Sequence, residues 1–171
     1  KIYDIIGMGH CGRSNVSNLL PQEYMMKNMK QVIKEAAFGL GIETIGITGK
    51  TDYSYLEDFL LCRKVKNIDC EFEEQNINKR LNAENLFPKC KSIIAIGVPY
   101  GEGYKIPSFS EKGLLSVSSY GEDYHKTVSF LLNKLAREIM RYVDFEYISC
   151  VDTTFLIDKE ICKNADLGNY G

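Results

Sequence analysis

The apolar stretch at residues 92–98, Ser-Ile-Ile-Ala-Ile-Gly-Val, restricts the possible folds of this 171-residue chain more than any other part of the sequence. It is rich in β-branched residues, and Pro99 follows it directly. A strand with one solvent-exposed face alternates polar and apolar residues, whereas a strand covered on both faces has a continuous apolar sequence. The stretch therefore predicts a strand that is buried on both faces.

The rest of the chain alternates between strand-like and helix-like patterns. Apolar residues at steps of three and four predict helices, and short β-branched runs predict strands. The predicted strands are 2–6, 44–48, 92–98 and 145–151, and the predicted helices are 26–40, 55–62, 123–142 and 155–166. We expect a loop or broken helix at 69–82 and a mobile lid or ligand-facing loop at 99–113. The alternation predicts an α/β fold, a layered sheet with flanking helices.

Composition and charge exclude several classes of protein. With 44% hydrophobic and 26% charged residues, the chain is neither a disordered tail nor a coiled coil. Its 21 basic and 23 acidic side chains give a net charge of −2, so no positive excess attracts nucleic acid or anionic lipid. The sequence has no apolar stretch near the roughly 20 residues that cross a bilayer, and no secretory h-region. We therefore expect a cytoplasmic protein without membrane contact.

The six cysteines do not have the spacing of a known metal or redox motif. They stand at positions 11, 62, 70, 90, 150 and 162, and no Cys-x-x-Cys occurs. Zinc-ribbon, thioredoxin-type and ferredoxin-type patterns are therefore missing from this sequence. We interpret the cysteines as small, reduced, buried hydrophobes and predict no metal site in this chain.

The glycines Gly7, Gly9 and Gly12 follow a short apolar run with the Gly-x-Gly-x-x-Gly spacing of a dinucleotide-binding turn. The surrounding sequence fits that motif poorly, because Pro21 interrupts the following helix and no acid stands at the ribose position. The alternatives are a glycine-rich turn, a weak His-Cys metal site at 10–11, or extra sequence ahead of the domain. We predict an N-terminal extension at 1–24 and a domain at 25–171, and keep a flavin- or dinucleotide-binding oxidoreductase as an alternative function.

Asp152 is the strongest candidate for acid catalysis in the sequence. It follows a predicted strand and precedes a predicted helix. Ligands in open α/β sheets collect at the carboxyl ends of strands, and partial burial would raise the pKa of a carboxyl group there, as a general acid requires. The alternative is structural, because aspartate before a helix is also a favoured N-cap.

Two further residues are candidates for ligand binding. His125 stands in the first turn of the predicted helix 123–142, where a structural hydrogen bond is the alternative to catalysis. Arg80 lies in a polar stretch, where it would either bind an anionic group or serve as a surface charge.

Four stretches of this sequence resemble the N-terminal domain of epoxyqueuosine reductase and its shorter relatives with a double iron–sulfur domain. The most specific is Ser-Ser-Tyr-Gly-Glu-Asp-Tyr-His at 118–125, since the family carries a similar Gly-x-Asp-Tyr-His. The other three stretches each combine several segments. The first is 33–37 together with 40–42 and 46–47, the second is 79–82 together with 86–88 and 92–98, and the third is Val-Asp-Thr at 151–153 together with Gly168-x-x-Gly171. The resemblance spans residues 33–171.

The resemblance implies a cobalamin-dependent oxidoreductase that acts in queuosine biosynthesis on a modified tRNA nucleoside, opening and deoxygenating an epoxide. The implied domain is similar to the corrinoid domain of reductive dehalogenases and has a nitroreductase-like α/β fold. The residue that matches the family's proposed proton donor is Asp152. The residues that match positions near the corrinoid are Arg80, Ser118, Tyr120, His125 and Thr153.

The sequence also departs from the family pattern. The family continues beyond Gly171 with Lys-Asn and with the cysteines of two [4Fe–4S] clusters, and its arginine seven residues after the aspartate is here Lys159. We therefore expect the clusters in an absent C-terminal domain, an electron-donor protein as partner, and any tRNA contact through absent regions. The chain would be a fragment or a short relative, inactive alone. A non-catalytic interaction domain remains a further alternative.

Overall fold

The structure is a computed structural model. It describes the backbone of residues 2–10 and 22–28 and, with side chains, residues 29–49, 52–100, 116, 119, 121–152 and 154–168. The elements in chain order are β1 (Ile2–His10), α1 (Gln22–Gly39), β2 (Thr44–Gly49), the 3-10 turn η1 (Ser54–Leu56), α2 (Glu57–Val65), α3 (Ile77–Arg80), the 3-10 turn η2 (Ala83–Asn85), β3 (Cys90–Val98), α4 (Tyr124–Ile139), β4 (Phe145–Cys150) and α5 (Asp158–Asn164).

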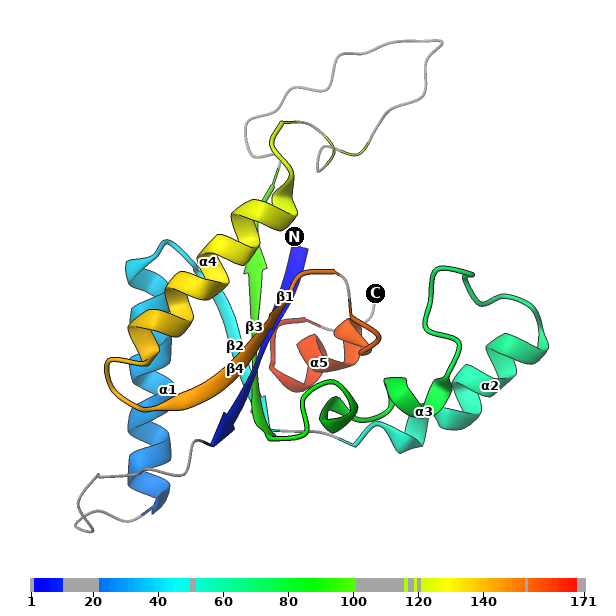
Figure 1. The fold of residues 1–171 in the computed structure, drawn as a ribbon, viewed down its shortest axis with the longest axis horizontal. Helices are drawn as coiled ribbons and strands as arrows, with labels where there is room; N and C mark the ends of the chain where they lie inside the picture. Colours follow the sequence, from blue (N-terminus) through cyan, green and yellow to red (C-terminus); the bar gives the residue numbers. More distant parts are fainter. Residues whose placement is uncertain are drawn as a thin grey trace.

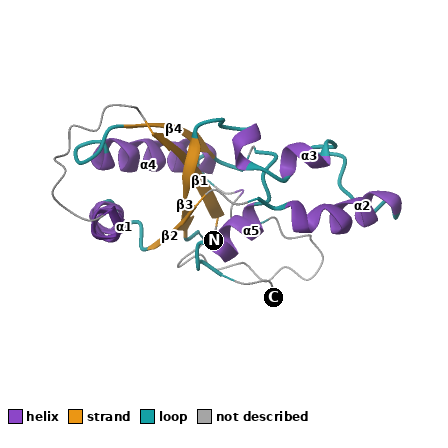
Figure 2. Cartoon of the chain, turned by 90° about the horizontal axis from the view of Figure 1, so that it is seen from below, coloured by secondary structure: helices purple, strands orange, loops and turns teal. Residues whose placement is uncertain are grey.

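The four strands form one antiparallel sheet with the order β2-β3-β1-β4. Helices α1 and α4 lie on one side of this sheet, and α2, α3 and α5 lie on the other (Figures 1 and 2). The described part of the chain is therefore an α/β fold with a helical layer on each side of the sheet, as the sequence predicts. Its strands are all antiparallel, a feature that the sequence pattern did not reveal.

Strand β3 is buried on both faces, which confirms the prediction from residues 92–98. Ile94 and Ile96 are fully buried in the cluster formed with α1 and α4, whereas Ile93 and Ala95 are buried in the opposite cluster with α5. This division follows from the period of two along a strand, which sends successive side chains to opposite faces. One strand thereby joins two separate hydrophobic cores.

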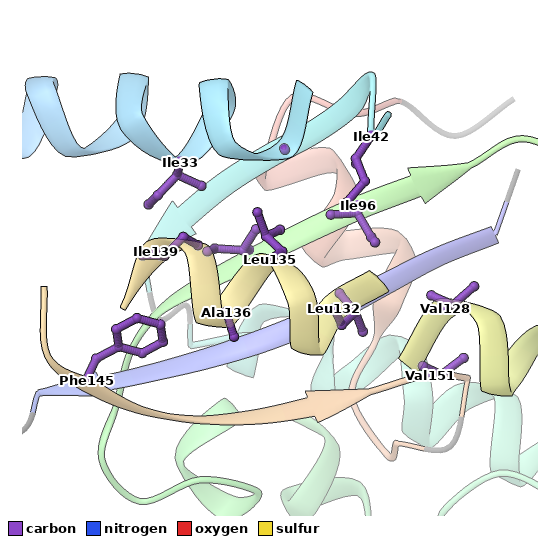
Figure 3. Packing of buried hydrophobic residues seen from close by; sticks show 12 residues of the cluster. Ile33, Ile42, Ile96, Val128, Leu132, Leu135, Ala136, Ile139, Phe145 and Val151 are labelled. Carbon is purple, nitrogen blue, oxygen red and sulfur yellow. The ribbon is translucent and has the colours of Figure 1, made fainter. Parts of the chain in front are cut away.

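The first core lies between the sheet and the helices α1 and α4 (Figure 3). Helix α4 contributes Val128, Leu132, Leu135 and Ile139, whose steps of three and four place them on one face of the helix. Each of these side chains is at most 1% exposed. Burying a side chain of this size contributes about 1.5–3 kcal/mol, so the face accounts for much of the stability of this layer.

The second core contains a buried carboxylate. Glu160 of α5 is only 2% exposed, and it accepts a hydrogen bond of 2.5 Å from the Tyr55 hydroxyl. This hydrogen bond, together with burial, raises the pKa of Tyr55 to about 12. The contact joins η1 to α5, and a buried carboxylate needs such a donor to offset its lost hydration.

The structure corrects the interpretation of the first glycines. Gly7 and Gly9 lie within β1 and not in a turn, and β1 pairs with both β3 and β4 at the centre of the sheet. A dinucleotide-binding turn requires glycines after a strand, at the entry to a helix, so these two do not form one. Gly12 and the adjacent Cys11 lie outside the described residues.

Other predictions hold with shifted boundaries or different burial. The stripe predicted for 55–62 leaves Phe59 61% exposed, and within α2 only Leu60 is buried. Of the five described cysteines, Cys62 and Cys70 are exposed, so the expectation of burial is wrong for these two.

No helix among the described residues combines the length and apolar character that a membrane crossing requires. The predicted loop at 101–113 lies outside the described residues.

The packing of α5 and the residues after it against the sheet leaves no room for a side chain at Gly46 of β2. A Cβ at this position would lie 2.8 Å from Cβ of Ala165 and 2.9 Å from Cγ of Leu167, whereas a Cβ at Gly49 of the same strand meets nothing within 4 Å. We predict that Gly46→Ala lowers the free energy of unfolding by about 1–3 kcal/mol or more, because α5 must move away. Urea unfolding followed by circular dichroism measures it. Equal effects of Gly46→Ala and the control Gly49→Ala would contradict this packing.

Candidate functional site at the sheet edge

Strand direction brings the predicted site residues to one edge of the sheet. Strands β3 and β4 each run antiparallel to β1, so their carboxyl ends, Val98 and Cys150, lie at the same edge. The segment after β4 then passes around this edge from one core to the other, since Val151 belongs to the first core and Leu156 to the second. We call this edge, with the segment 151–158 and the first turn of α4, the rim.

Asp152 is the exposed residue of the rim. Its backbone φ of 50° is left-handed, a conformation that aspartate and asparagine tolerate better than most residues. The Tyr124 hydroxyl donates a hydrogen bond of 2.7 Å to its Oδ2. The sequence predicted partial burial or a helix cap, and both expectations are wrong. The side chain is exposed, and Ile157 occupies the N-cap position of α5.

His125 follows Tyr124, the hydrogen-bond partner of Asp152, in the first turn of α4. Its Nδ1 lies 2.7 Å from Oδ1 of Asp123, and the same oxygen accepts the His125 backbone N–H at 3.0 Å. Asp123 is therefore the N-cap of α4, and the imidazole followed by the backbone N–H lowers the pKa of its carboxyl group. The rings of Tyr124 and His125 stack with centroids 4.1 Å apart. His125 thus has a structural contact and still presents a half-buried ring at the rim.

Asp158, the first residue of α5, is a member of this group that the sequence analysis missed. Its Oδ1 is buried and has no hydrogen-bond partner among the described residues. Burial, and next the nearby charge of Asp152, raise the pKa of Asp158 from 3.8 to about 6, while Arg80 acts in the opposite direction. An acid at the start of a helix is usually exposed and favourable to the helix dipole, so no residue pattern predicts that this oxygen is buried.

Arg80, the last residue of α3, is already paired with an acidic side chain. Its Nη1 donates to Glu73 at 2.6 Å, and Arg63 holds the same carboxylate at 2.8 and 3.2 Å. The Arg63 hydrogen bonds and then those of Arg80 lower the pKa of Glu73 against the effect of burial. The Arg80 side chain is only 15% exposed, and its Nε is buried without a hydrogen-bond partner among the described residues. Arg80 therefore acts on the rim mainly through its charge.

The structure brings together part of the predicted site. Asp152 and His125 both contact or adjoin Tyr124, and the charge of Arg80 reaches Asp158, which also lies near Asp152. The other three predicted residues, Ser118, Tyr120 and Thr153, lie outside the described residues. Within the described part of the chain, no group of three or more His, Cys, Asp or Glu side chains is placed to hold a metal ion.

The chemistry available at the rim is proton transfer and hydrogen bonding. An exposed carboxyl group, a phenol hydroxyl that orients it and a second carboxyl group with a raised pKa lie in one region. Titratable groups in environments that differ in this way are typical of acid–base sites. The rim therefore offers a ligand both hydrogen-bonding groups and titratable groups.

A comparison with protein families agrees with this location. Residues 80–153 match the family model described as "Epoxyqueuosine reductase QueG, DUF1730". The matched segment begins at Arg80 and includes His125 and Asp152. Over this segment the chain is similar to the epoxyqueuosine reductases, which confirms the resemblance stated above.

Individual relatives extend the match over most of the chain. Epoxyqueuosine reductase from Lactococcus garvieae is 35% identical over 150 residues, which cover 85% of this chain and 43% of that protein. The enzyme from Staphylococcus aureus is 34% identical over 150 residues, 85% of this chain and 40% of that protein. The chain thus spans about two fifths of the length of the curated relatives that it matches.

Solved structures share the fold. The structure of epoxyqueuosine reductase from Streptococcus thermophilus superposes with a TM-score of 0.74 at 33% identity, covering 84% of this chain and 40% of that chain. An epoxyqueuosine reductase with an epoxyqueuosine-modified tRNA stem loop gives 0.72 at 30% identity, covering 85% and 39%. The Bacillus subtilis enzyme, solved with an aspartate-bearing catalytic loop swung out of its active site, gives 0.61 at 26% identity, covering 85% and 39%.

The raised pKa of Asp158 predicts a dependence of stability on pH. A carboxyl group whose pKa is raised in the fold stabilises it fully below the unfolded pKa of 3.8, and this contribution is lost as the pH rises through about 6. We predict that Asp158→Asn gains roughly 2–3 kcal/mol relative to the wild type between pH 4 and pH 7. Urea unfolding at both pH values measures this difference, with the exposed Asp144→Asn as control. A difference that stays constant with pH would refute the burial of this carboxyl group.

Proposed function

We propose that this chain forms the corrinoid-binding part of an epoxyqueuosine-reductase-like protein, and that Asp152 is its proton donor. The proposal includes cobalamin as the cofactor, a modified tRNA nucleoside as the substrate, and the cytoplasm as the place of action. The observation that carries it is the exposed Asp152 carboxyl group, held by Tyr124 at the rim, within the segment 80–153 that matches the family model.

The hydrogen-bonding groups of the described rim suit a corrinoid. A corrinoid is a planar ring with amide side chains, which need both donors and acceptors of hydrogen bonds. The Tyr124–His125 stack offers an aromatic surface with an imidazole, and Asp152 offers an exposed carboxyl group. We propose that His125 and Tyr124, with the undescribed Ser118, Tyr120 and Thr153, hold the ring. Arg80 would contribute to binding through its charge, because Glu73 already occupies its Nη1.

In this proposal, the bound corrinoid supplies the reducing electrons, and the residues of this chain control the proton. Tyr124 donates to Oδ2 of Asp152, which leaves Oδ1 available to a ligand at the rim. A protonated Asp152 then gives its proton to the departing epoxide oxygen, which would otherwise leave as a poor, charged group. The electron-donor protein and the two [4Fe–4S] clusters implied by the family would act from outside the described residues.

The first prediction from this function concerns binding. Titration of the chain with hydroxocobalamin is expected to change the visible spectrum of the corrinoid and to release measurable heat. We predict that His125→Ala weakens binding at least about tenfold, because a hydrogen-bonding and stacking group is lost from the rim. The control is Tyr142→Ala, at an exposed tyrosine three residues after the C-terminal end of α4. Absence of both a spectral change and a binding heat in the wild-type chain would reject the proposed cofactor.

The second prediction concerns the proton. Asp152→Asn, introduced into a longer form that carries the clusters, is expected to bind the corrinoid normally and to lower turnover by roughly 10²-fold or more. Asparagine has a similar shape and tolerates the left-handed backbone, so the substitution isolates the loss of the acid. Turnover of epoxyqueuosine-containing tRNA, measured by mass spectrometry of the nucleosides, tests this role. Full turnover in the variant would show that another group is the proton donor.

A further inference from the structure

His125 has two ring nitrogens, and only one of them has a partner among the described residues. Its Nδ1 lies 2.7 Å from Oδ1 of Asp123. No described residue forms a hydrogen bond with Nε2, and 42% of the His125 side chain is exposed. Nε2 is therefore the nitrogen that a ligand at the rim can reach, and the position of the ring proton decides whether this atom donates or accepts a hydrogen bond.

The partner of Nδ1 is a carboxylate. The imidazole and then the backbone N–H of His125 lower the pKa of Asp123, so its carboxyl group is ionised near neutral pH. An ionised carboxylate only accepts hydrogen bonds, so the proton in this contact lies on Nδ1. A neutral imidazole carries one ring proton, and Nε2 is then left with a free lone pair. In free histidine the opposite form, with the proton on Nε2, prevails.

Further contacts hold the ring and its carboxylate in place. The Asp123 oxygen that faces Nδ1 also accepts the His125 backbone N–H at 3.0 Å, as the N-cap of α4. The imidazole stacks on the ring of Tyr124, with centroids 4.1 Å apart and 26° between the planes. Tyr124 in turn donates to Asp152 at 2.7 Å. The imidazole and the Asp152 carboxyl group thus belong to one connected set of contacts at the rim.

We propose that Asp123 is a positioning residue that holds the neutral His125 ring in its Nδ1–H form, so that Nε2 accepts a hydrogen bond from the ligand. The inference rests on the proposed function, and it specifies the chemical group that His125 recognises. The partner of Nε2 must carry an N–H or O–H group, as the amide side chains of a corrinoid do. Without the carboxylate, the ring would take up the Nε2–H form and present a donor at the same atom.

The first test measures the tautomer of His125 by ¹⁵N NMR in this chain, without corrinoid. The two nitrogens of a neutral imidazole differ widely in chemical shift according to which of them carries the proton. At a pH high enough for the shifts to stop changing, we expect at least about 80% of the Nδ1–H form in the wild type. The spectrum of His125→Ala assigns the signals, because the chain has one other histidine, His10.

Two substitutions of Asp123 separate positioning of the ring from capping of the helix. Serine and asparagine are both favoured N-caps, so both variants keep the first turn of α4, which circular dichroism checks. Asparagine retains an acceptor oxygen for Nδ1, whereas the serine side chain is one atom shorter. We expect the Nδ1–H fraction to fall below about one half in Asp123→Ser and to stay within about 10% of the wild-type value in Asp123→Asn. A dominant Nδ1–H form in Asp123→Ser overturns the proposal, because a residue that only caps the helix leaves the tautomer unchanged.

The second test measures binding of hydroxocobalamin by calorimetry. Asp123→Ser is expected to weaken binding about threefold or more in the wild-type background, and less than about 1.5-fold in the His125→Ala background. Equal weakening in both backgrounds overturns the proposal, because Asp123 would then act without the ring. If the chain binds no corrinoid, the proposed cofactor fails, while the tautomer of His125 still decides whether Asp123 positions the ring.

Discussion

Strand β3 has no face in contact with water, because Ile94 and Ile96 pack against α1 and α4 while Ile93 and Ala95 pack on the side of α5. A sheet built around such a strand is stable only with a helical layer on each side, and each buried isoleucine contributes about 1.5–3 kcal/mol to that arrangement. The segment that follows β4 must therefore go around the edge of the sheet to reach α5, and this path creates the rim.

The rim combines stability with an unfavourable arrangement of charge. Val151 and Leu156 are buried in opposite cores and hold both ends of the turn, so Asp152 between them is exposed with a left-handed backbone. Asp158 at the start of α5 is half-buried, and its Oδ1 is buried without a hydrogen-bond partner among the described residues. Proteins keep such destabilising groups mainly at functional sites, and this agrees with the match of the surrounding segment to a reductase family.

The solved structures that share this fold are of longer proteins. The chain covers about 40% of the Streptococcus thermophilus enzyme with a TM-score of 0.74. The described rim contains an exposed acid, Asp152, and the aromatic stack of Tyr124 and His125. In the function proposed here, electron delivery comes from elsewhere, so the acid–base part of the reaction and its reducing part are carried by different units.

The sequence by itself determined the layered α/β fold, the two-sided burial of residues 92–98 and the family resemblance, because these depend on local periodicity and on short motifs. It also pointed to Asp152 and His125. Only the tertiary structure decided that Gly7 and Gly9 lie within a central strand, that Arg80 is paired with Glu73, and that Oδ1 of Asp158 is buried. Strand pairing and the burial of a charge depend on contacts between distant segments, and no local pattern of residues records them.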